Sequence, residues 1–178
     1  MPIKTTLLRL FLVVSLTPLL QLTMAAQITN IKCIVLDKRC VDFTECRLRV
    51  VKRDVNEISV YAKILQLPVV NASTQLKFMK KSNGYRPYIG EVKNDACKFL
   101  ETQKNPLVKY LYSFIRPYTN INHTCPINHD IVLRNFRIDE KLLNRAGILP
   151  TGEYAFFVTW TLNSMKCGRT EMFFKHKE

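Results

Sequence analysis

Apolar residues alternate with polar ones in several segments, and this period of two most limits what the chain can fold into. In segment 58–64 isoleucine, valine, alanine and isoleucine occupy every second position, separated by serine, tyrosine and lysine. Segment 154–162 repeats the pattern with tyrosine, phenylalanine, valine, tryptophan and leucine. β-Branched and aromatic residues at this spacing indicate strands with one buried face. The pattern therefore predicts an all-β protein.

Turn sequences separate these strands from others. Asn83-Gly84 favours a tight turn because both residues tolerate positive φ, and Pro150-Thr151-Gly152 precedes the aromatic segment. Further candidate strands lie at 28–36, 44–51, 75–80, 85–92, 130–138 and 170–174. Seven or eight strands with such turns predict a β-sandwich.

One short helix is expected between the strands. Asn105 is a suitable N-cap and Pro106 suits the first helical position. Apolar residues then recur at i, i+3, i+4 and i+7, which places them on one face: Leu107, Tyr110, Leu111 and Phe114. We expect Pro117 to end this helix, which would cover a sheet edge or a gap between two sheets.

The first 26 residues have the features of a signal peptide. A basic head with Lys4 and Arg9 precedes an apolar run over 10–22 and then small residues. A membrane anchor is the alternative, but the run is interrupted by polar residues and is shorter than the roughly 20 residues that a bilayer requires. We therefore divide the chain into a signal peptide, 1–26, and one domain, 27–178, and expect a secreted extracellular protein that does not span the membrane.

The cysteines and glycosylation sequons fit that compartment. Six cysteines in 27–178 predict three disulfides among 15 possible pairings: Cys33, Cys40, Cys46, Cys97, Cys125 and Cys167. No paired Cys/His spacing suggests zinc, so we expect no metal and no cofactor. Asn71-Ala72-Ser73 and Asn122-His123-Thr124 are predicted glycan sites on the surface, although some such triplets stay unmodified.

The chain is strongly basic. Cleavage after residue 26 would remove Lys4 and Arg9 and no acidic residue, and so lower the formal net charge from +13 to +11. The basic residues are spread along the chain and suit solvated strand faces. The alternative is attraction to a receptor or an acidic extracellular partner. Nucleic acid is not expected, because no motif for it is present.

Catalytic motifs are missing. His129-Asp130 resembles the His-Asp pair of small secreted phospholipases, but those enzymes need a glycine-rich calcium loop, and the five glycines of this chain are not clustered. Neither a Gly-x-Ser-x-Gly nor a His-Glu-x-x-His sequence occurs. We predict a binding protein and not an enzyme.

Large apolar residues are abundant, and two uses are open. They fill a solid core, or some of them line a cavity between splayed sheets that holds an apolar ligand. Both faces of segments 156–157 and 173–174 are aromatic, which exceeds the need of a one-sided sheet. The candidate lining residues are Phe78, Tyr85, Tyr88, Phe99, Leu107, Leu111, Phe114, Phe156 and Trp160.

Several blocks together carry a family resemblance: CRLRVVKRD, NGYRPYIG, DACKFL, NHTCPINHDIVLRNF and LPTGEYAFFV. The chain resembles a large family of secreted insect proteins, best represented in fruit flies, with members linked to gustatory hairs and pheromone response. That family is similar to the ML (MD-2-related) lipid-recognition domain, which implies an immunoglobulin-like, ML-type β-sandwich that opens between its sheets. The resemblance implies a non-enzymatic carrier or presenter of a lipid-like ligand, such as a hydrocarbon pheromone or fatty derivative.

The resemblance also implies a disulfide pattern. Cys33, Cys46, Cys97 and Cys125 match family positions, which implies the pairs Cys33–Cys46 and Cys97–Cys125. Cys40 and Cys167 are additional in this chain and would pair with each other. The alternative of Cys33–Cys167 with Cys40–Cys46 stays open, because related lipid-binding domains use it.

Overall fold

The computed structural model describes residues 25–145 and 149–177. Eight strands form two antiparallel sheets, a five-stranded sheet in the order β1-β8-β7-β4-β5 and a three-stranded sheet in the order β2-β3-β6. The strands are β1 (Ala25–Val35), β2 (Val41–Lys52), β3 (Val55–Ile64), β4 (Ala72–Ser82), β5 (Gly84–Asp95), β6 (Ile131–Phe136), β7 (Gly152–Leu162) and β8 (Met165–Lys177). The predicted signal peptide lies outside the described residues, apart from Ala25 and Ala26 at the start of β1.

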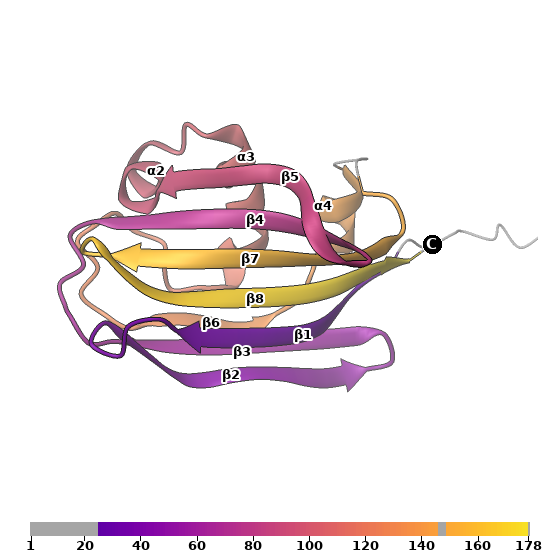
Figure 1. The fold of residues 1–178 in the computed structure, drawn as a ribbon, viewed down its shortest axis with the longest axis horizontal. Helices are drawn as coiled ribbons and strands as arrows, with labels where there is room; N and C mark the ends of the chain where they lie inside the picture. The colour runs from indigo at the N-terminus through magenta and orange to yellow at the C-terminus, as the bar shows by residue number, and fades with distance from the viewer. Residues whose placement is uncertain (1–24, 146–148, 178) are drawn as a thin grey trace, which may run out of the picture.

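The prediction of an all-β sandwich is confirmed. Figure 1 shows the five strands of the larger sheet in front, from β5 at the top to β1 at the bottom, and the smaller sheet behind its lower part. The helices α2 (Ala96–Thr102) and α3 (Pro106–Ile115) lie by the upper edge. The inner face of the larger sheet is thus covered partly by strands and partly by helices.

The expected helix is present, but the prediction of a single helix is wrong. Asn105 caps α3 by accepting a hydrogen bond from the Val108 amide at 3.2 Å. The α-helix ends at Ile115 and continues as a 3₁₀ turn, η1 (Arg116–Tyr118), which contains Pro117. The helices α2 and α4 (Glu140–Arg145) are too short to show a repeating apolar stripe, so periodicity did not reveal them.

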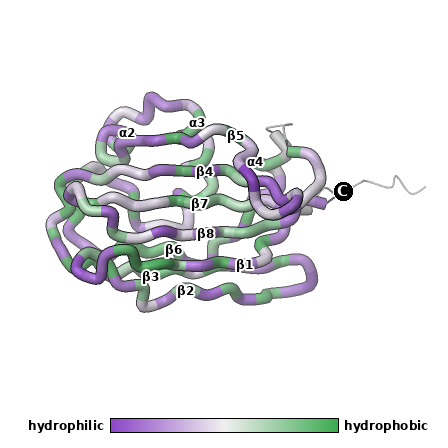
Figure 2. Tube along the Cα trace, viewed as in Figure 1, coloured by the Kyte–Doolittle hydropathy of each residue, from purple (hydrophilic) through white to green (hydrophobic). Residues whose placement is uncertain are grey.

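Inward and outward faces follow the alternation in the sequence. The predicted buried set on β3 (Ile58, Val60, Ala62 and Ile64) is buried. At one end of the sandwich Ala62 and Ile64 pack with Ala72 and Leu162 of the larger sheet. Elsewhere Ile28, Ile58 and Phe136 form a second buried cluster, on which Phe114 and Ile115 of α3 pack. Figure 2 shows hydrophobic stretches within the strands and hydrophilic residues at the β2–β3 turn and over α4.

Three disulfides hold the sandwich together, as the resemblance implied. Cys33–Cys46 joins β1 to β2, the neighbouring edges of the two sheets, with 6.1 Å between the Cα atoms. Cys40–Cys167 ties the β1–β2 loop to β8, and Cys97–Cys125 ties α2 to the segment before β6. All six cysteines are therefore paired.

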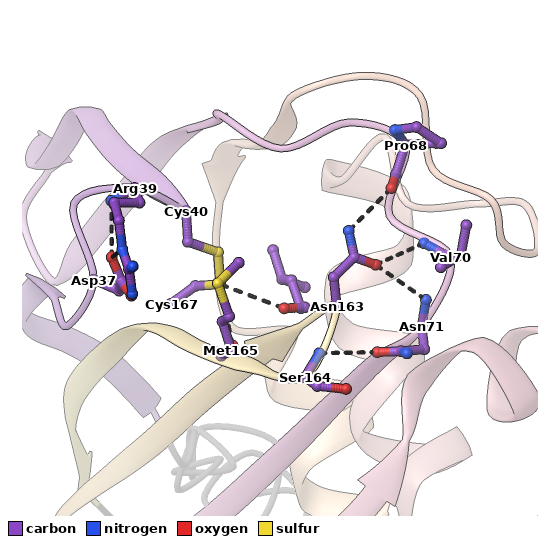
Figure 3. The surroundings of a disulfide bond; sticks show 11 residues. Asp37, Arg39, Cys40, Pro68, Val70, Asn71, Asn163, Ser164, Met165 and Cys167 are labelled. Atoms are coloured by element: carbon purple, nitrogen blue, oxygen red, sulfur yellow. Dashed lines mark hydrogen bonds and ion pairs between the residues drawn. A yellow bond between two sulfur atoms is a disulfide. The ribbon is translucent and has the colours of Figure 1, made fainter.

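The β7–β8 turn fixes the loop between β3 and β4. Asn163 and Ser164 have φ of 45° and 68°, the left-handed region that a two-residue hairpin turn requires. The Asn163 side chain donates to the Pro68 carbonyl at 3.0 Å and accepts from the Val70 amide at 3.0 Å (Figure 3). Asn71 accepts a hydrogen bond from the Ser164 amide through its side-chain oxygen at 3.1 Å, so the two segments hold each other.

Candidate functional site

The inward face of the larger sheet is built from cross-strand rows. Antiparallel pairing places Leu76, Val158 and Thr170 in one row on β4, β7 and β8. The next row along the strands contains Phe78, Phe156 and Met172. Directly opposite residues lie on the same face, so all six side chains point toward the smaller sheet and α3. We call these two rows the central rows.

On β7 and β8 the residues of the central rows are less buried than residues nearer either end of the strand. On β7, Tyr154 and Leu162 are 0% and 4% exposed, whereas Phe156, Val158 and Trp160 between them are only partly buried. On β8, Cys167 and Phe174 are buried, whereas Thr170 and Met172 between them are partly buried. A close-packed sandwich would bury its middle most completely. The reversed order indicates accessible space along the central rows.

Aromatic side chains gather at the end of the central rows nearest the β4–β5 turn and include Phe78 and Phe156 of those rows. The rings of Phe78, Tyr154, Phe156 and Phe174 are nearly parallel, with interplanar angles of 8–25° and centroids 4.6–6.3 Å apart. Tyr88 of β5 packs edge-on against Phe78 and Tyr154. Aromatic pairs in such arrangements add roughly 0.5–1.5 kcal/mol beyond the area that they bury. The cluster therefore forms a rigid apolar wall.

Helix α3 is held in place by hydrogen bonds from its tyrosines. The Tyr112 hydroxyl donates to the Ile121 carbonyl at 2.5 Å, and Tyr110 donates to the Leu142 carbonyl of α4 at 2.8 Å. Burial raises the pKa of both tyrosines. Phe99 of α2 packs edge-on against Tyr112. These contacts join α2, α3, α4 and the segment after η1 into one cover beside the larger sheet.

The structure brings most of the predicted lining residues toward the interior, but not all of them. Phe78, Phe156 and Trp160 lie on the inward face, and Tyr88 packs on its aromatic cluster. On the helices Phe99 is buried, Leu111 and Phe114 are partly buried, and Leu107 is 40% exposed at the surface. Tyr85 lies on the outward face, against Phe157 and Phe173.

Sequence reasoning missed several residues that share the inward face. They are Leu76, Lys80, Tyr154, Val158, Thr170, Met172 and Phe174. Those on β4 and β7 have the same parity as a predicted residue of their strand. On β8, Met172 stands opposite the predicted Phe156, and Thr170 and Phe174 share the parity of Met172. The strand alternation could therefore have found those on β4 and β7, whereas those on β8 required the register between strands.

Two open hollows lie elsewhere on the surface. The first is lined by Ala26, Lys52, Asp54, Val55, Asn56, Arg137, Ile138, Asp139 and Glu140. The second is lined by Pro117, Tyr118, Thr119, Asn120, Val132 and Arg134. Both contain charged side chains, and neither contains a predicted lining residue. Their composition does not suit an apolar ligand.

The histidines do not form a catalytic pair with the neighbouring aspartate. His129 faces His123, with the two Nε2 atoms 2.8 Å apart, and its Nδ1 lies 3.0 Å from the side-chain Nδ2 of Asn120. The Asp130 carboxylate instead accepts from the Tyr61 hydroxyl at 2.7 Å and the Ile64 amide at 2.9 Å. The hydrogen bond from Tyr61 and then that from Ile64 lower the pKa of Asp130. Within residues 25–145 and 149–177, no cluster of three or more metal-ligating side chains is found.

Both glycosylation sequons lie at the same end of the sandwich. Asn71 and Asn122 are exposed. Their segments meet where Val69 and Ile127 exchange backbone hydrogen bonds of 2.9 and 3.0 Å. The opposite end, with the β4–β5 turn, carries no sequon.

The outward face of the smaller sheet carries a buried carboxylate between two arginines. Glu57 is 2% exposed and forms ion pairs with Arg49, at 2.7 Å, and with Arg137. The hydrogen bond from Arg49 is the main cause that lowers the pKa of Glu57, and desolvation opposes it. Half of each arginine side chain remains exposed, so the pair presents guanidinium groups at the surface.

Comparison with known proteins finds a family without an assigned activity. Residues 74–156 match the model of a family described as protein of unknown function (DUF1091). The matched stretch runs from β4 into β7 and includes α2 and α3, and so covers much of the candidate site. No curated protein matches the chain. None of the helices in the described part of the chain is long and apolar enough to cross a membrane.

Proposed function

We propose that this protein is a secreted, non-enzymatic carrier that holds an apolar, lipid-like molecule between its two sheets. The observation that carries the proposal is the burial of the central rows. Phe156, Val158 and Met172 keep accessible surface in the middle of the sandwich, whereas residues nearer the two ends of the same strands are buried. Ligand pockets are typically apolar, concave and bordered by aromatic groups. The adjacent aromatic cluster meets that description.

The compartment and the chemosensory role belong to the same proposal. Three disulfides suit an oxidising compartment, and both sequons are exposed where an oligosaccharide transferase could reach them. The resemblance to secreted insect proteins and to the ML lipid-recognition domain supports a hydrocarbon pheromone or fatty derivative as the ligand.

The first test is native mass spectrometry of the secreted, glycosylated protein, followed by extraction of bound small molecules. We expect a stoichiometric apolar adduct that extraction removes. The emission of Trp160, the single tryptophan, should then change when fatty acids, sterols or long hydrocarbons are added. A clean apo mass together with unchanged emission for the whole panel would refute the carrier proposal.

Two neighbouring phenylalanines provide matched variants. Phe156 points inward along the central rows and Phe157 points outward against Phe173. We expect Phe156→Ala to change ligand uptake and Phe157→Ala to leave it unaltered. Equal effects of the two substitutions would show that uptake does not depend on the interior.

A second candidate function rests on Arg49 and Arg137. Their exposed guanidinium groups, fixed by Glu57, suit docking on a receptor or acidic extracellular partner. Such binding should weaken steeply with salt, since exposed charges are screened beyond about 10 Å at 0.1 M. Ligand uptake between the sheets should depend little on salt, so a salt titration separates the two functions.

A further inference from the structure

A lysine lies on the inward face at the edge of the aromatic cluster. Lys80 stands opposite Tyr154 in the strand pairing, two residues beyond Phe78 on β4. Its Nζ lies 5.3 Å from the ring centroid of Tyr88 and 5.7 Å from that of Tyr154. The charge is thus held against aromatic faces at one end of the apolar surface.

The neighbouring lysines on β4 have different partners from those of Lys80. Lys77 and Lys81 point outward and form ion pairs with Glu91, at 3.3 Å, and with Glu153, at 2.8 Å. Lys80 has no carboxylate within ion-pair distance in the described part of the chain. Lys77 and Lys81 therefore have counter-charges, whereas the ammonium group of Lys80 contacts only aromatic rings among the described residues.

The position of Lys80 is fixed and open to a ligand. A Cβ atom at Gly152 would lie 3.6 Å from Lys80 Cε and 3.4 Å from the Tyr154 ring, so the lysine stem crosses the glycine beside that ring. Tyr88, on which the ammonium group rests, is 37% exposed. Both sequons lie at the other end of the sandwich, so glycans would not cover Lys80.

We infer that the ligand is an amphiphile with a single anionic head group, and that Lys80 is the counter-charge for that head. This inference rests on the proposed carrier function. The tail passes Phe78 and Phe156 along the central rows toward Trp160. Trp160 lies six residues beyond Tyr154 on β7, about 20 Å away in an extended strand. A long-chain tail anchored at Lys80 therefore ends near the tryptophan.

The test compares ligands that share a tail and differ in head charge. Oleate, methyl oleate and an oleyl phosphate are titrated into the glycosylated protein while Trp160 emission is followed. Lys80→Met removes the charge and keeps the length of the side chain. Lys77→Met is the matched control, because it removes an outward charge from the same strand. Lys80→Arg restores the charge.

We expect the wild-type protein to bind oleate about tenfold more tightly than methyl oleate, the size of effect that a hydrogen bond to a charged group supports. Lys80→Met should abolish that ratio and leave methyl oleate binding within about twofold, while Lys77→Met and Lys80→Arg retain the ratio. The phosphate arm shows which anionic head Lys80 prefers, and a preference for either supports the inference.

The two proposals fail in different ways. Equal binding of oleate and methyl oleate by the wild-type protein, or equal losses for both ligands in Lys80→Met, would overturn the head-group inference and leave the carrier proposal standing. Binding of none of the three ligands, with no response from Trp160, would overturn both.

Discussion

Filling the space beside Val158 distinguishes a hollow sandwich from a solid one. Val158 lies in a central row between Leu76 and Thr170 and is partly buried. If the space is available, Val158→Phe buries a larger side chain and adds up to about 1.5 kcal/mol to the free energy of unfolding. That value is the difference between the ends of the range for burying an apolar side chain. If the interior is already filled, overpacking costs about 1–3 kcal/mol.

The matched control is Val41→Phe. Val41 is 4% exposed and packs with Ala62 and Ile64 in the closed end of the sandwich. For a domain of this size, 1 kcal/mol moves the melting temperature by roughly 2–4 °C. We expect Val41→Phe to melt about 2–12 °C below the wild type, and Val158→Phe to melt at the wild-type temperature or up to about 6 °C above it.

Calorimetry of the oxidised protein measures both variants, and Trp160 emission measures their ligand uptake. Val158→Phe should take up less ligand although it is no less stable. If Val158→Phe lowers the melting temperature as much as Val41→Phe does, no accessible space exists beside the central rows, and the reasoning is refuted.

Three further results are expected. Replacing Cys40 and Cys167 by alanine should lower the free energy of unfolding more than replacing Cys33 and Cys46, because the first pair is 127 residues apart and the second 13. The loop-closure entropy that a disulfide removes from the unfolded chain corresponds to about 4.7 kcal/mol for a loop of 100 residues and about 3 kcal/mol for one of 15. Equal losses in denaturant unfolding would contradict this prediction. Glu57→Gln should lower the melting temperature at neutral pH. The difference in melting temperature from the wild type should shrink as the pH falls below the ordinary pKa of 4.5 toward the lower pKa of the folded state, because a carboxylate with a depressed pKa stabilises the folded state only while ionised. A difference independent of pH would exclude the ion pairs as its cause. Asn163→Gly keeps the left-handed turn but removes the side chain, so the Val70 amide should exchange hydrogen faster, whereas Asn163→Asp, which keeps the acceptor, should protect it; equal protection in both would mean that the side chain does not hold the loop.

The strands and the long helix could be predicted because their signals are local. The alternation in 58–64 and 154–162 identifies β3 and β7 and the residues that each buries. Asn105 and Pro106 identify the start of α3. These patterns depend only on residues close in sequence, and the packing of the domain does not change the elements that they predict.

The candidate site was harder to predict because it depends on register and on the distance between the sheets. Tyr85 and Tyr88 are three residues apart, so alternation itself places them on opposite faces, and the structure separates them accordingly. Lys80 has the parity of Phe78, but the proposed role of its charge depends on Tyr154, which the strand register places opposite it. Met172 joined the central rows through the β7–β8 pairing, which no local pattern specifies.

The place of β8 in the larger sheet has a consequence for biosynthesis. It follows all other strands in sequence yet lies between β1 and β7, so β1 has no partner in its sheet until the ribosome has made residues 165–177. Cys40 likewise waits for Cys167, while Cys33 and Cys46 are already close by in the nascent chain. Early pairing of Cys40 with either of them must be reversed by thiol–disulfide exchange before the last strand can dock. Closure of the larger sheet therefore requires β8 to have been made, and the yield of correctly paired protein depends on the isomerases and the redox poise of the compartment in which it folds.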